Sequence, residues 1–245
     1  MVIDINYDFR RDAKGGDPDS RSQTLRHYHK ILWSKLLPNG KDFKLVGGRN
    51  RIYLHHRSEL GAFFLGSDSI THSYKNHVRK QWLVRQIPDE VNELCNAGCT
   101  IGAYIIFPNN RIDQQRTING ARGCHVKIDD RFDLTLECIR RFYLGLESPL
   151  YHTILRYKNF FDLFGDFQGY INFFLLQDLI DERGQIKFYL PFDNFAKPPT
   201  FEGVDDYLLY KHGVLDFIRR RNERIRKSLT GNAGVIEHLL FAARV

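Results

Sequence analysis

Cysteine and long apolar runs are scarce in this sequence of 245 residues. The four cysteines lie at positions 95, 99, 124 and 138, and no second close pair follows the first at zinc-site spacing. No window of about 18 uncharged apolar residues exists, so we expect no membrane span. The N-terminal stretch MVIDINYDFRRDAKGGDPDS is charged and lacks the apolar region of a signal peptide. We therefore expect reduced thiols and a cytoplasmic location.

The common catalytic motifs are also missing. The chain contains no P-loop, no GxGxxG, no HExxH and no GxSxG, and it has no internal repeat or low-complexity run. No motif therefore assigns a reaction class or a cofactor, and whether the protein is an enzyme stays open.

Aromatic and basic residues are plentiful by contrast. The 19 Phe, the 12 Tyr and a hydrophobic fraction of 42% supply a large core, which argues against disorder. We expect one globular domain over residues 1–245. The 36 basic and 29 acidic residues give a net charge of +7. This balance favours nucleic acid or a phosphorylated small molecule as the partner, although solubility alone also explains it.

The sequence before residue 70 predicts a loop, a helix and short strands. The polar segment 10–23 contains Gly-Gly and Asp-Pro and predicts a loop. Ser22 or Thr24 can then cap a helix that ends before Pro38. Two apolar runs flank Gly-Gly-Arg-Asn at 47–50, which predicts a hairpin.

The middle of the chain predicts a helix and the best strand. Pro88 and the acids that follow it open a helix that stops at Gly98. The segment CTIGAYIIFP, residues 99–108, is apolar on both faces, so we expect a central strand there. RTIN at 116–119 is a candidate for its returning partner.

The second half predicts mostly helices. One helix starts at Asp133 as its cap, one runs from Ser148-Pro149 to Gly165, and an apolar one follows deep in the core. A strand is expected at 185–190, then a long helix and a separate peripheral helix at 228–245. The predicted fold is α+β: a small, mainly antiparallel sheet from the first half and strand 185–190, packed against helices of the second half.

The stretch TINGARGCHVKIDDRFD, residues 117–133, is the best place to look for chemistry. Its basic residues and two glycines suit an anion site made by backbone amides and arginines. For phosphate binding we name Arg116, Arg122, Arg131, Arg140 and Arg141.

The acids of the same region suit a different role. Asp133, Glu137, Arg140 and Arg141 share one helix face, so they form either part of a site or a buried ion-pair network. If the region is catalytic, the acid–base residues are His125, Asp130, Asp133 and Glu137.

Two earlier clusters are weaker candidates. His56, Glu59, Asp68 and His72 match no metal template, so we predict no metal site there and favour an exposed, turn-rich surface. The segment Arg26–Trp33 carries basic and aromatic residues that can stack on bases, although a tryptophan such as Trp33 is more often a core anchor.

The arginine-rich segment FIRRRNERIRK gives a candidate nucleic-acid surface. Clustered basic residues on a helix are typical of such surfaces, and they also occur on ordinary solvated faces. The residues named for nucleic-acid contact are Arg219, Arg220, Arg224 and Lys227.

Several stretches resemble, as a set, an uncharacterised bacterial protein family of about this length. They are TLRHYHKILWSKLLPNG, YLHHRSELGAFFLGSDSI, TIGAYIIFPNNRI, TINGARG, DRFDLTLECIRRFY and GYINFFLLQDLI, between about residues 8 and 225. The resemblance implies a bacterial, cytoplasmic, single-domain protein. It supplies no catalytic residue.

Three functional hypotheses follow. The first is a protein that binds or processes nucleic acid through the 116–141 region. The second is an enzyme acting on a nucleotide or a phosphorylated metabolite, with Arg122 and Arg131 holding the anion. The third is a non-catalytic module that binds another protein. Any of them can use the same scaffold.

Overall fold

The structure is a computed structural model that describes residues 3–47, 53–71 and 81–242. Strands come from the first half of the described chain and helices dominate the second half, which confirms the α+β class. The strands are β1 (Lys35–Leu36), β2 (Asp42–Phe43), β3 (Val46–Gly47), β4 (Leu54–Ser58), β5 (Gly61–Ser69) and β6 (Tyr104–Pro108). The α-helices are α1 (Pro18–Arg21), α2 (Gln23–Trp33), α3 (Gln81–Val84), α4 (Pro88–Ala97), α5 (Ile118–Cys124), α6 (Phe132–Tyr143), α7 (Tyr151–Leu155), α8 (Lys158–Phe161), α9 (Phe167–Phe173) and α10 (Val204–Ala242).

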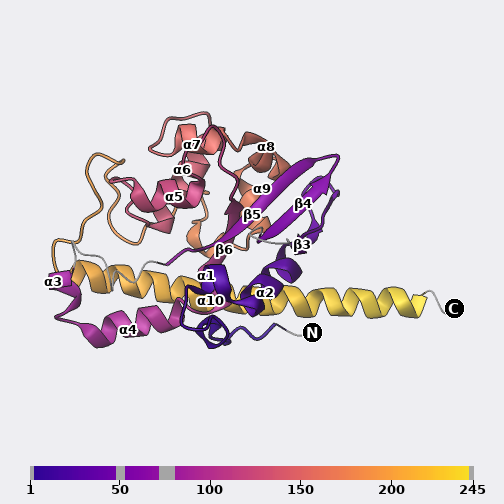
Figure 1. Cartoon of the computed structure of the whole chain (residues 1–245), viewed down its shortest axis with the longest axis horizontal. Coiled ribbons are helices and arrows are strands. Elements are labelled where there is room, and N and C mark those ends of the chain that lie inside the picture. The colour runs from indigo at the N-terminus through magenta and orange to yellow at the C-terminus, as the bar shows by residue number, and fades with distance from the viewer. Residues whose placement is uncertain (1–2, 48–52, 72–80, 243–245) are drawn as a thin grey trace.

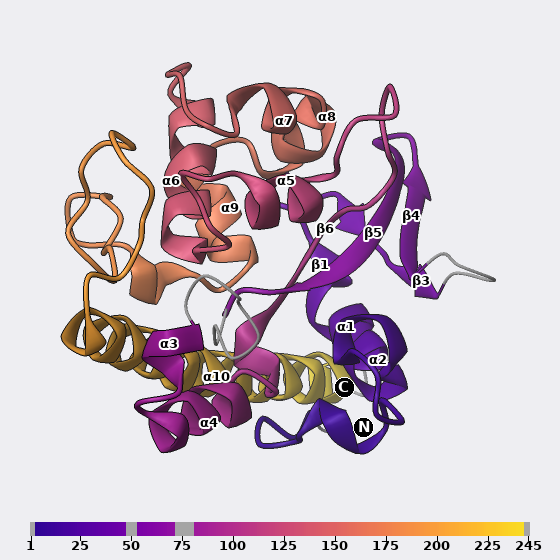
Figure 2. The ribbon, with the colours of Figure 1, turned by 60° about the vertical axis from the view of Figure 1, so that its left-hand side comes forward.

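The helices form two groups. Helices α5–α9 gather together beside the sheet, and the long α10 runs below them with α4 beside it (Figures 1 and 2). Helices α1 and α2 lie next to α10 in both views. No helix among the described residues has the length and apolar content needed to cross a membrane.

The N-terminal segment is partly helical where a loop was predicted. Residues 10–23 contain the end of a 3-10 helix, Phe9–Arg11, and the short helix α1. Pro18 sits at the start of α1 and the Asp17 carboxylate caps it, so the Asp-Pro pair begins a helix. Ser22 then caps α2 by accepting the Leu25 amide, as predicted.

The main sheet has the order β3-β4-β5-β6 and is antiparallel throughout. The predicted hairpin is confirmed by the β3–β4 pairing, with its tip at 48–52 outside the described residues. Strand β6 is buried along its whole length, yet it lies at an edge of the described sheet. The prediction of a central strand was therefore wrong, because helices rather than a further strand cover it.

The helix predicted from Pro88 is confirmed as α4, but RTIN is not a strand. The Thr117 hydroxyl accepts the Gly120 amide and opens α5. The Thr117 cap and the burial of Ile118 and Arg122 hold this helix, although Gly120 and Gly123 have low helix propensity. The change matters for function because α5 carries Arg122 into the interior.

The second half differs from prediction in three further places. Arg131, not Asp133, is the N-cap of α6. The predicted helix from 149 to 165 is divided into α7, α8 and a 3-10 turn, Asp162–Phe164. The strand at 185–190 does not form: Ile186 makes an isolated bridge with Ile180, and the Tyr189 amide bonds the Asp133 carboxylate instead of a strand.

Helix α10 is one continuous element, so the separate C-terminal helix predicted at 228–245 is wrong over its described part. Arg221 fastens α10 to the body. Its guanidinium is fully buried and donates to the carbonyl oxygens of Gly102, Tyr104 and Phe174. Gly102 allows the close approach, because a Cβ there would lie 2.7 Å from the Ile218 carbonyl oxygen.

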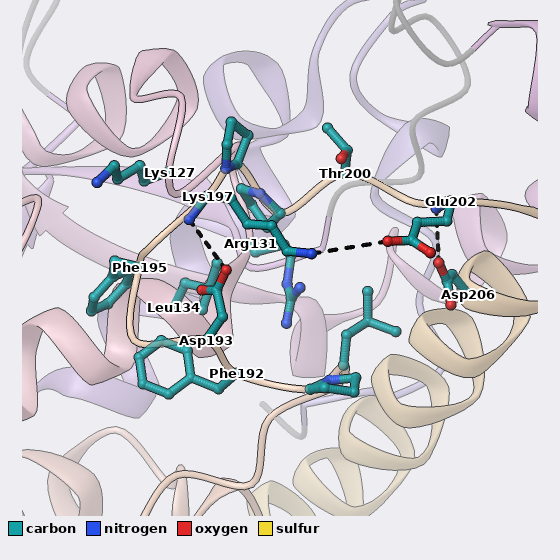
Figure 3. Close-up of a pocket in the computed structure, with 14 residues that line it drawn as sticks. Lys127, Arg131, Leu134, Phe192, Asp193, Phe195, Lys197, Thr200, Glu202 and Asp206 are labelled. Carbon is teal, nitrogen blue, oxygen red and sulfur yellow. Dashed lines mark hydrogen bonds and ion pairs between the residues drawn. The ribbon is translucent and has the colours of Figure 1, made fainter.

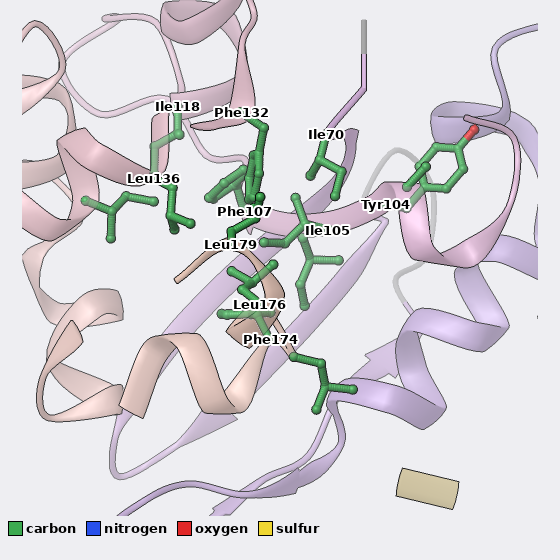
Figure 4. Close-up of a cluster of buried hydrophobic side chains, with 14 of the residues drawn as sticks. Ile70, Tyr104, Ile105, Phe107, Ile118, Phe132, Leu136, Phe174, Leu176 and Leu179 are labelled. Atoms are coloured by element: carbon green, nitrogen blue, oxygen red, sulfur yellow. The ribbon is translucent and has the colours of Figure 1, made fainter. Parts of the chain in front are cut away.

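A cluster of apolar side chains fixes α5 and α6 against the sheet (Figure 4). Phe107 of β6, Ile118 of α5 and Phe132 of α6 are fully buried in it. Leu176 and Leu179 close the cluster from the segment after α9. The turn between α5 and α6 is thus held between two packed helices, which makes it a rigid place for a site.

Candidate functional site

The turn that joins α5 to α6 lies at the centre of the 117–133 stretch. Asp129 and Asp130 both adopt the left-handed backbone conformation, with φ of 45° and 63°. Their amides bond the carbonyl oxygens of His125 and Arg122, so the turn wraps around the end of α5. Non-glycine residues with positive φ are uncommon and gather at functional sites.

Arg122 is the hub beneath this turn. The guanidinium is fully buried, and Nη1 lies 2.5 Å from Asp68 Oδ2 and 3.1 Å from Asp130 Oδ1. Other donations go to the Ser69 and Asp130 carbonyl oxygens and to the Thr135 hydroxyl. Two carboxylates and three neutral acceptors occupy its donors, so this arginine is poorly suited to bind a phosphate.

Next to the hub, Asp19 and Asp68 form a pair of carboxyls on α1 and β5. The Ser67 hydroxyl donates to Asp19, and the Asn119 amide donates to the Ser67 carbonyl oxygen. Burial raises the pKa of Asp19 to about 7 and that of Asp68 to about 6, the second against the pull of Arg122. These carboxyls can exchange protons near neutral pH, the property expected of acid–base groups.

The acids on α6 are engaged in ion pairs. Asp133 is fully buried and pairs with Arg131, and Glu137 pairs with Arg140 at 2.7 Å and with Arg141 at 2.8 Å. This matches the ion-pair network that the sequence left open. Asp133 and Glu137 are therefore held by arginines, and neither lines the pocket that contains His125.

On one side of the turn lies a pocket that we call the basic pocket. Its volume is about 530 Å³, and none of the described residues that line it is acidic. Arg116 is exposed in it, and Arg156 reaches it from the end of α7. The lining residues are Gln114, Gln115, Arg116, Ala121, Cys124, His125, Val126, Leu150, Thr153 and Arg156.

His125 has a defined role in the basic pocket. Its Nδ1 accepts the Lys127 amide at 3.2 Å, which assigns the proton of the neutral ring to Nε2. Burial and the nearby Lys127 charge lower the pKa of His125, so the neutral ring dominates at pH 7. The ring thus offers an Nε2–H donor to a ligand and is not arranged as a general base.

Arg156 supports the same site. Its Nη1 and Nη2 donate to the carbonyl oxygens of His152 and Arg116, which orients the guanidinium. Its buried Nε has no acceptor among the described residues. No local pattern in the sequence selects Arg156, because only the fold brings the end of α7 beside the segment 114–116.

On the other side of the turn lies a second pocket, of about 320 Å³, that we call the mixed-charge pocket (Figure 3). Lys127 and Arg131 line it from the turn, Glu202 lines it from the segment just before α10, and Asp206 lines it from the first turn of α10. The wall thus contains acidic and basic side chains together with Phe192, Phe195 and prolines.

The arginine-rich face of α10 is largely neutralised. Arg220 lies 2.8 Å from Asp216, Arg224 lies 2.8 Å from Asp178, and Arg226 pairs with Glu223. Arg219 and Lys227 are exposed. These residues lie on α10, apart from the turn that joins α5 to α6 in Figures 1 and 2.

The remaining candidates lie elsewhere. His29 and Trp33 are fully buried, and His56 is buried between Phe43 and Phe63, while Glu59 is exposed and pairs with Lys41. His72 lies outside the described residues. Within the described chain, no group of three or more His, Cys, Asp or Glu residues is arranged to hold a metal ion.

The predicted residues thus separate into distinct places. His125 and Arg116 share the basic pocket, Arg131 lines the mixed-charge pocket, and Asp130 meets Arg122 in the hub. The sequence missed Asp19 and Arg156, which reach the site from segments distant in the chain.

Comparisons with known proteins agree with the absence of a familiar motif. Neither the curated proteins nor the solved structures contain a match to this chain. One family model matches residues 3–225 of the 245-residue chain, and its members share no established activity. The chain therefore belongs to a family of unknown function, DUF6994.

Proposed function

We propose that this protein binds a phosphorylated small molecule in the basic pocket. The observation that carries the proposal is the charge of the wall: Arg116, Arg156 and His125 offer N–H donors, and no described lining residue is acidic. Arginine is well matched to phosphate, because its guanidinium forms paired, charge-assisted hydrogen bonds. A volume of about 530 Å³ lies within the range of small-molecule sites.

A small molecule fits these observations better than nucleic acid. A nucleic-acid surface needs several unpaired cations that follow the phosphate backbone. On α10 three arginines are paired with carboxylates, and Arg122 is paired inside the fold. The basic pocket is instead a local concavity with two arginines, which suits one phosphate group and the body attached to it.

The arrangement favours binding over acid–base catalysis by His125. The Nδ1 atom is occupied by the Lys127 amide, so proton abstraction by this ring would require that hydrogen bond to break. As a donor through Nε2, the ring adds a hydrogen bond to a ligand oxygen without any change in protonation.

We also propose that the protein works in a reducing, cytoplasmic environment. Cys124 is exposed in the wall of the basic pocket, and the structure joins none of the four cysteines in a disulfide. An exposed thiol is compatible with the cytoplasm, where thiols stay reduced.

Thermal denaturation with a matched ligand panel tests the proposed function. The panel contains pyrophosphate, ribose 5-phosphate, nucleoside monophosphates and triphosphates, and the unphosphorylated nucleosides. A phosphorylated ligand at about 100 times its Kd should stabilise the fold by about 2.7 kcal/mol, and Arg116→Met should reduce this stabilisation by about half or more. Stabilisation by nucleosides alone, or a flat panel, would contradict the proposal.

A further inference from the structure

We propose that the mixed-charge pocket binds an amino acid with an apolar side chain, in its zwitterionic form. This inference is independent of the basic pocket, from which it is separated by the turn that joins α5 to α6. The two pockets differ in the sign and balance of their charges, and the difference decides which ligand each can accept.

The lining of the mixed-charge pocket carries charges of both signs. Its basic residues are Lys127, Arg131 and Lys197, its acidic ones are Asp193, Glu202 and Asp206, and Arg131 is already paired with the buried Asp133. A phosphate group with two negative charges would meet three carboxylates there, which disfavours it. A small ligand that carries one charge of each sign can meet both Lys127 and the acidic residues of this wall.

The charges are also separated in space. In Figure 3, Lys127 lies on one side of the pocket, Glu202 and Asp206 lie on the other, and the Arg131 guanidinium lies between them. The pairing of Arg131 with Asp133 fixes the orientation of that guanidinium. We place the ligand carboxylate toward Lys127, beside the Arg131–Asp133 pair, and the ligand ammonium toward Glu202 and Asp206.

Some of the lining charges are already engaged. Asp193 accepts the backbone amides of Ala196 and Lys197, so it shapes the loop. Lys197 and Glu202 are 4.0 Å apart and both exposed, which makes their pair weak. Asp206 accepts the Glu202 amide through Oδ2. Glu202 can therefore turn toward an ammonium group at little cost, and Asp206 can offer its other oxygen, Oδ1, without losing the Glu202 amide.

The apolar part of the wall suits the side chain of the ligand. Leu134 and Phe192 line the pocket, and Phe195 packs edge-on against Phe192 with ring centroids 4.9 Å apart. The Arg141 guanidinium lies 5.0 Å from the Phe195 ring centroid and steadies it. A volume of about 320 Å³ is at the small end of ligand sites, which fits an amino acid.

Calorimetric titration with L-leucine, leucine methyl ester and N-acetyl-leucine tests this inference. The ester lacks the carboxylate and the acetylated compound lacks the ammonium group. We expect leucine to bind and each derivative to bind at least about tenfold more weakly, because each leaves one side of the pocket unpaired. Equal binding of leucine and a derivative would overturn the zwitterion assignment.

Two variants locate the binding, and a third is the matched control. Lys127→Met and Asp206→Asn should each weaken leucine binding by about tenfold or more. Asn retains an oxygen that accepts the Glu202 amide, so the start of α10 is preserved. Arg116→Met, in the basic pocket, should leave leucine affinity unchanged. No heat from leucine at about 10 mM with the wild type, or full binding by both pocket variants, would overturn the proposal.

Discussion

Arg116 and Arg122 come from one short segment and serve opposite purposes. Arg122 points into the protein, where Asp68, Asp130, two carbonyl oxygens and a hydroxyl use its donors. Arg116 is exposed at the rim of a pocket whose described lining has no acid. The number of arginines in a segment therefore does not predict whether the segment binds an anionic ligand. The carboxylates that tertiary structure brings to each arginine decide whether its charge is available.

The largest effect should come from Arg122. Arg122→Met leaves Asp68 and Asp130 without their buried partner, and we expect the free energy of unfolding to fall by about 3–5 kcal/mol. Urea denaturation measures this change. Arg116→Met is the matched control and should fall within about 0.5 kcal/mol of wild type, as exposed substitutions usually do. If the two variants had similar free energies of unfolding, the conclusion that Arg122 is structural and Arg116 is not would be contradicted.

The next effect concerns ligand affinity. Arg116→Met removes charge-assisted hydrogen bonds from the basic pocket, so the affinity for the phosphorylated ligand found in the panel should fall by at least about tenfold. Titration calorimetry with that ligand gives the ratio. Arg116→Lys should retain part of the affinity, because it keeps the charge and loses the paired geometry. Unchanged affinity in Arg116→Met would exclude this pocket.

A smaller effect concerns pH and the carboxyl pair beside the hub. Burial raises the pKa of Asp19 from 3.8 to about 7, so the folded protein binds this proton more tightly than the unfolded chain. The stability that Asp19 contributes is full below about pH 4 and is lost as pH rises through about 7.

Asp19→Asn isolates this contribution. The variant should gain stability relative to wild type at about pH 8, and the gain should shrink as pH falls toward 6. Calorimetric melting of both proteins at matched pH measures it. The comparison also cancels the opposite effect of His29, whose pKa is lowered to about 3 by burial and which destabilises the fold below pH 6.5. A gain that does not depend on pH would contradict the raised pKa.

The smallest effect is expected on α10. Arg219→Gln combined with Arg220→Gln should change phosphate-ligand affinity by less than about twofold at 0.15 M salt, because screening weakens interactions beyond about 8 Å. The same titration measures it. A large loss in this double variant would show that long-range charge, rather than the basic pocket, controls binding.

Local signals in the sequence predicted much of the fold. Ser22 and Pro88 begin helices where cap rules place them, and the hairpin around 47–50 pairs as its flanking runs indicate. Failures occurred where tertiary contacts override local preference. The segment RTIN forms the start of α5 and not a strand. In the segment 185–190, the Tyr189 amide donates to the Asp133 carboxylate and not to a neighbouring strand.

The candidate site was less accessible to sequence reasoning. The stretch 117–133 borders both pockets, and Arg116 and His125 line the same one. The residues that decide whether each arginine can bind a ligand are distant in the sequence. Asp68, which pairs with Arg122, lies on β5, and Arg156, which lies beside Arg116, is at the end of α7. No local sequence pattern encodes such pairings. From the sequence alone, Arg116 and Arg122 are therefore equivalent candidates for phosphate binding.

The most direct test observes both arginines in the unmodified protein. Arginine side-chain Nε–H signals can be followed by NMR while pyrophosphate is added, with assignments taken from the Arg116→Met and Arg122→Lys spectra. We expect the Arg116 and Arg156 signals to shift with a common affinity while the Arg122 signal stays in place. Movement of the Arg122 signal, or no movement of the Arg116 signal, would contradict this expectation.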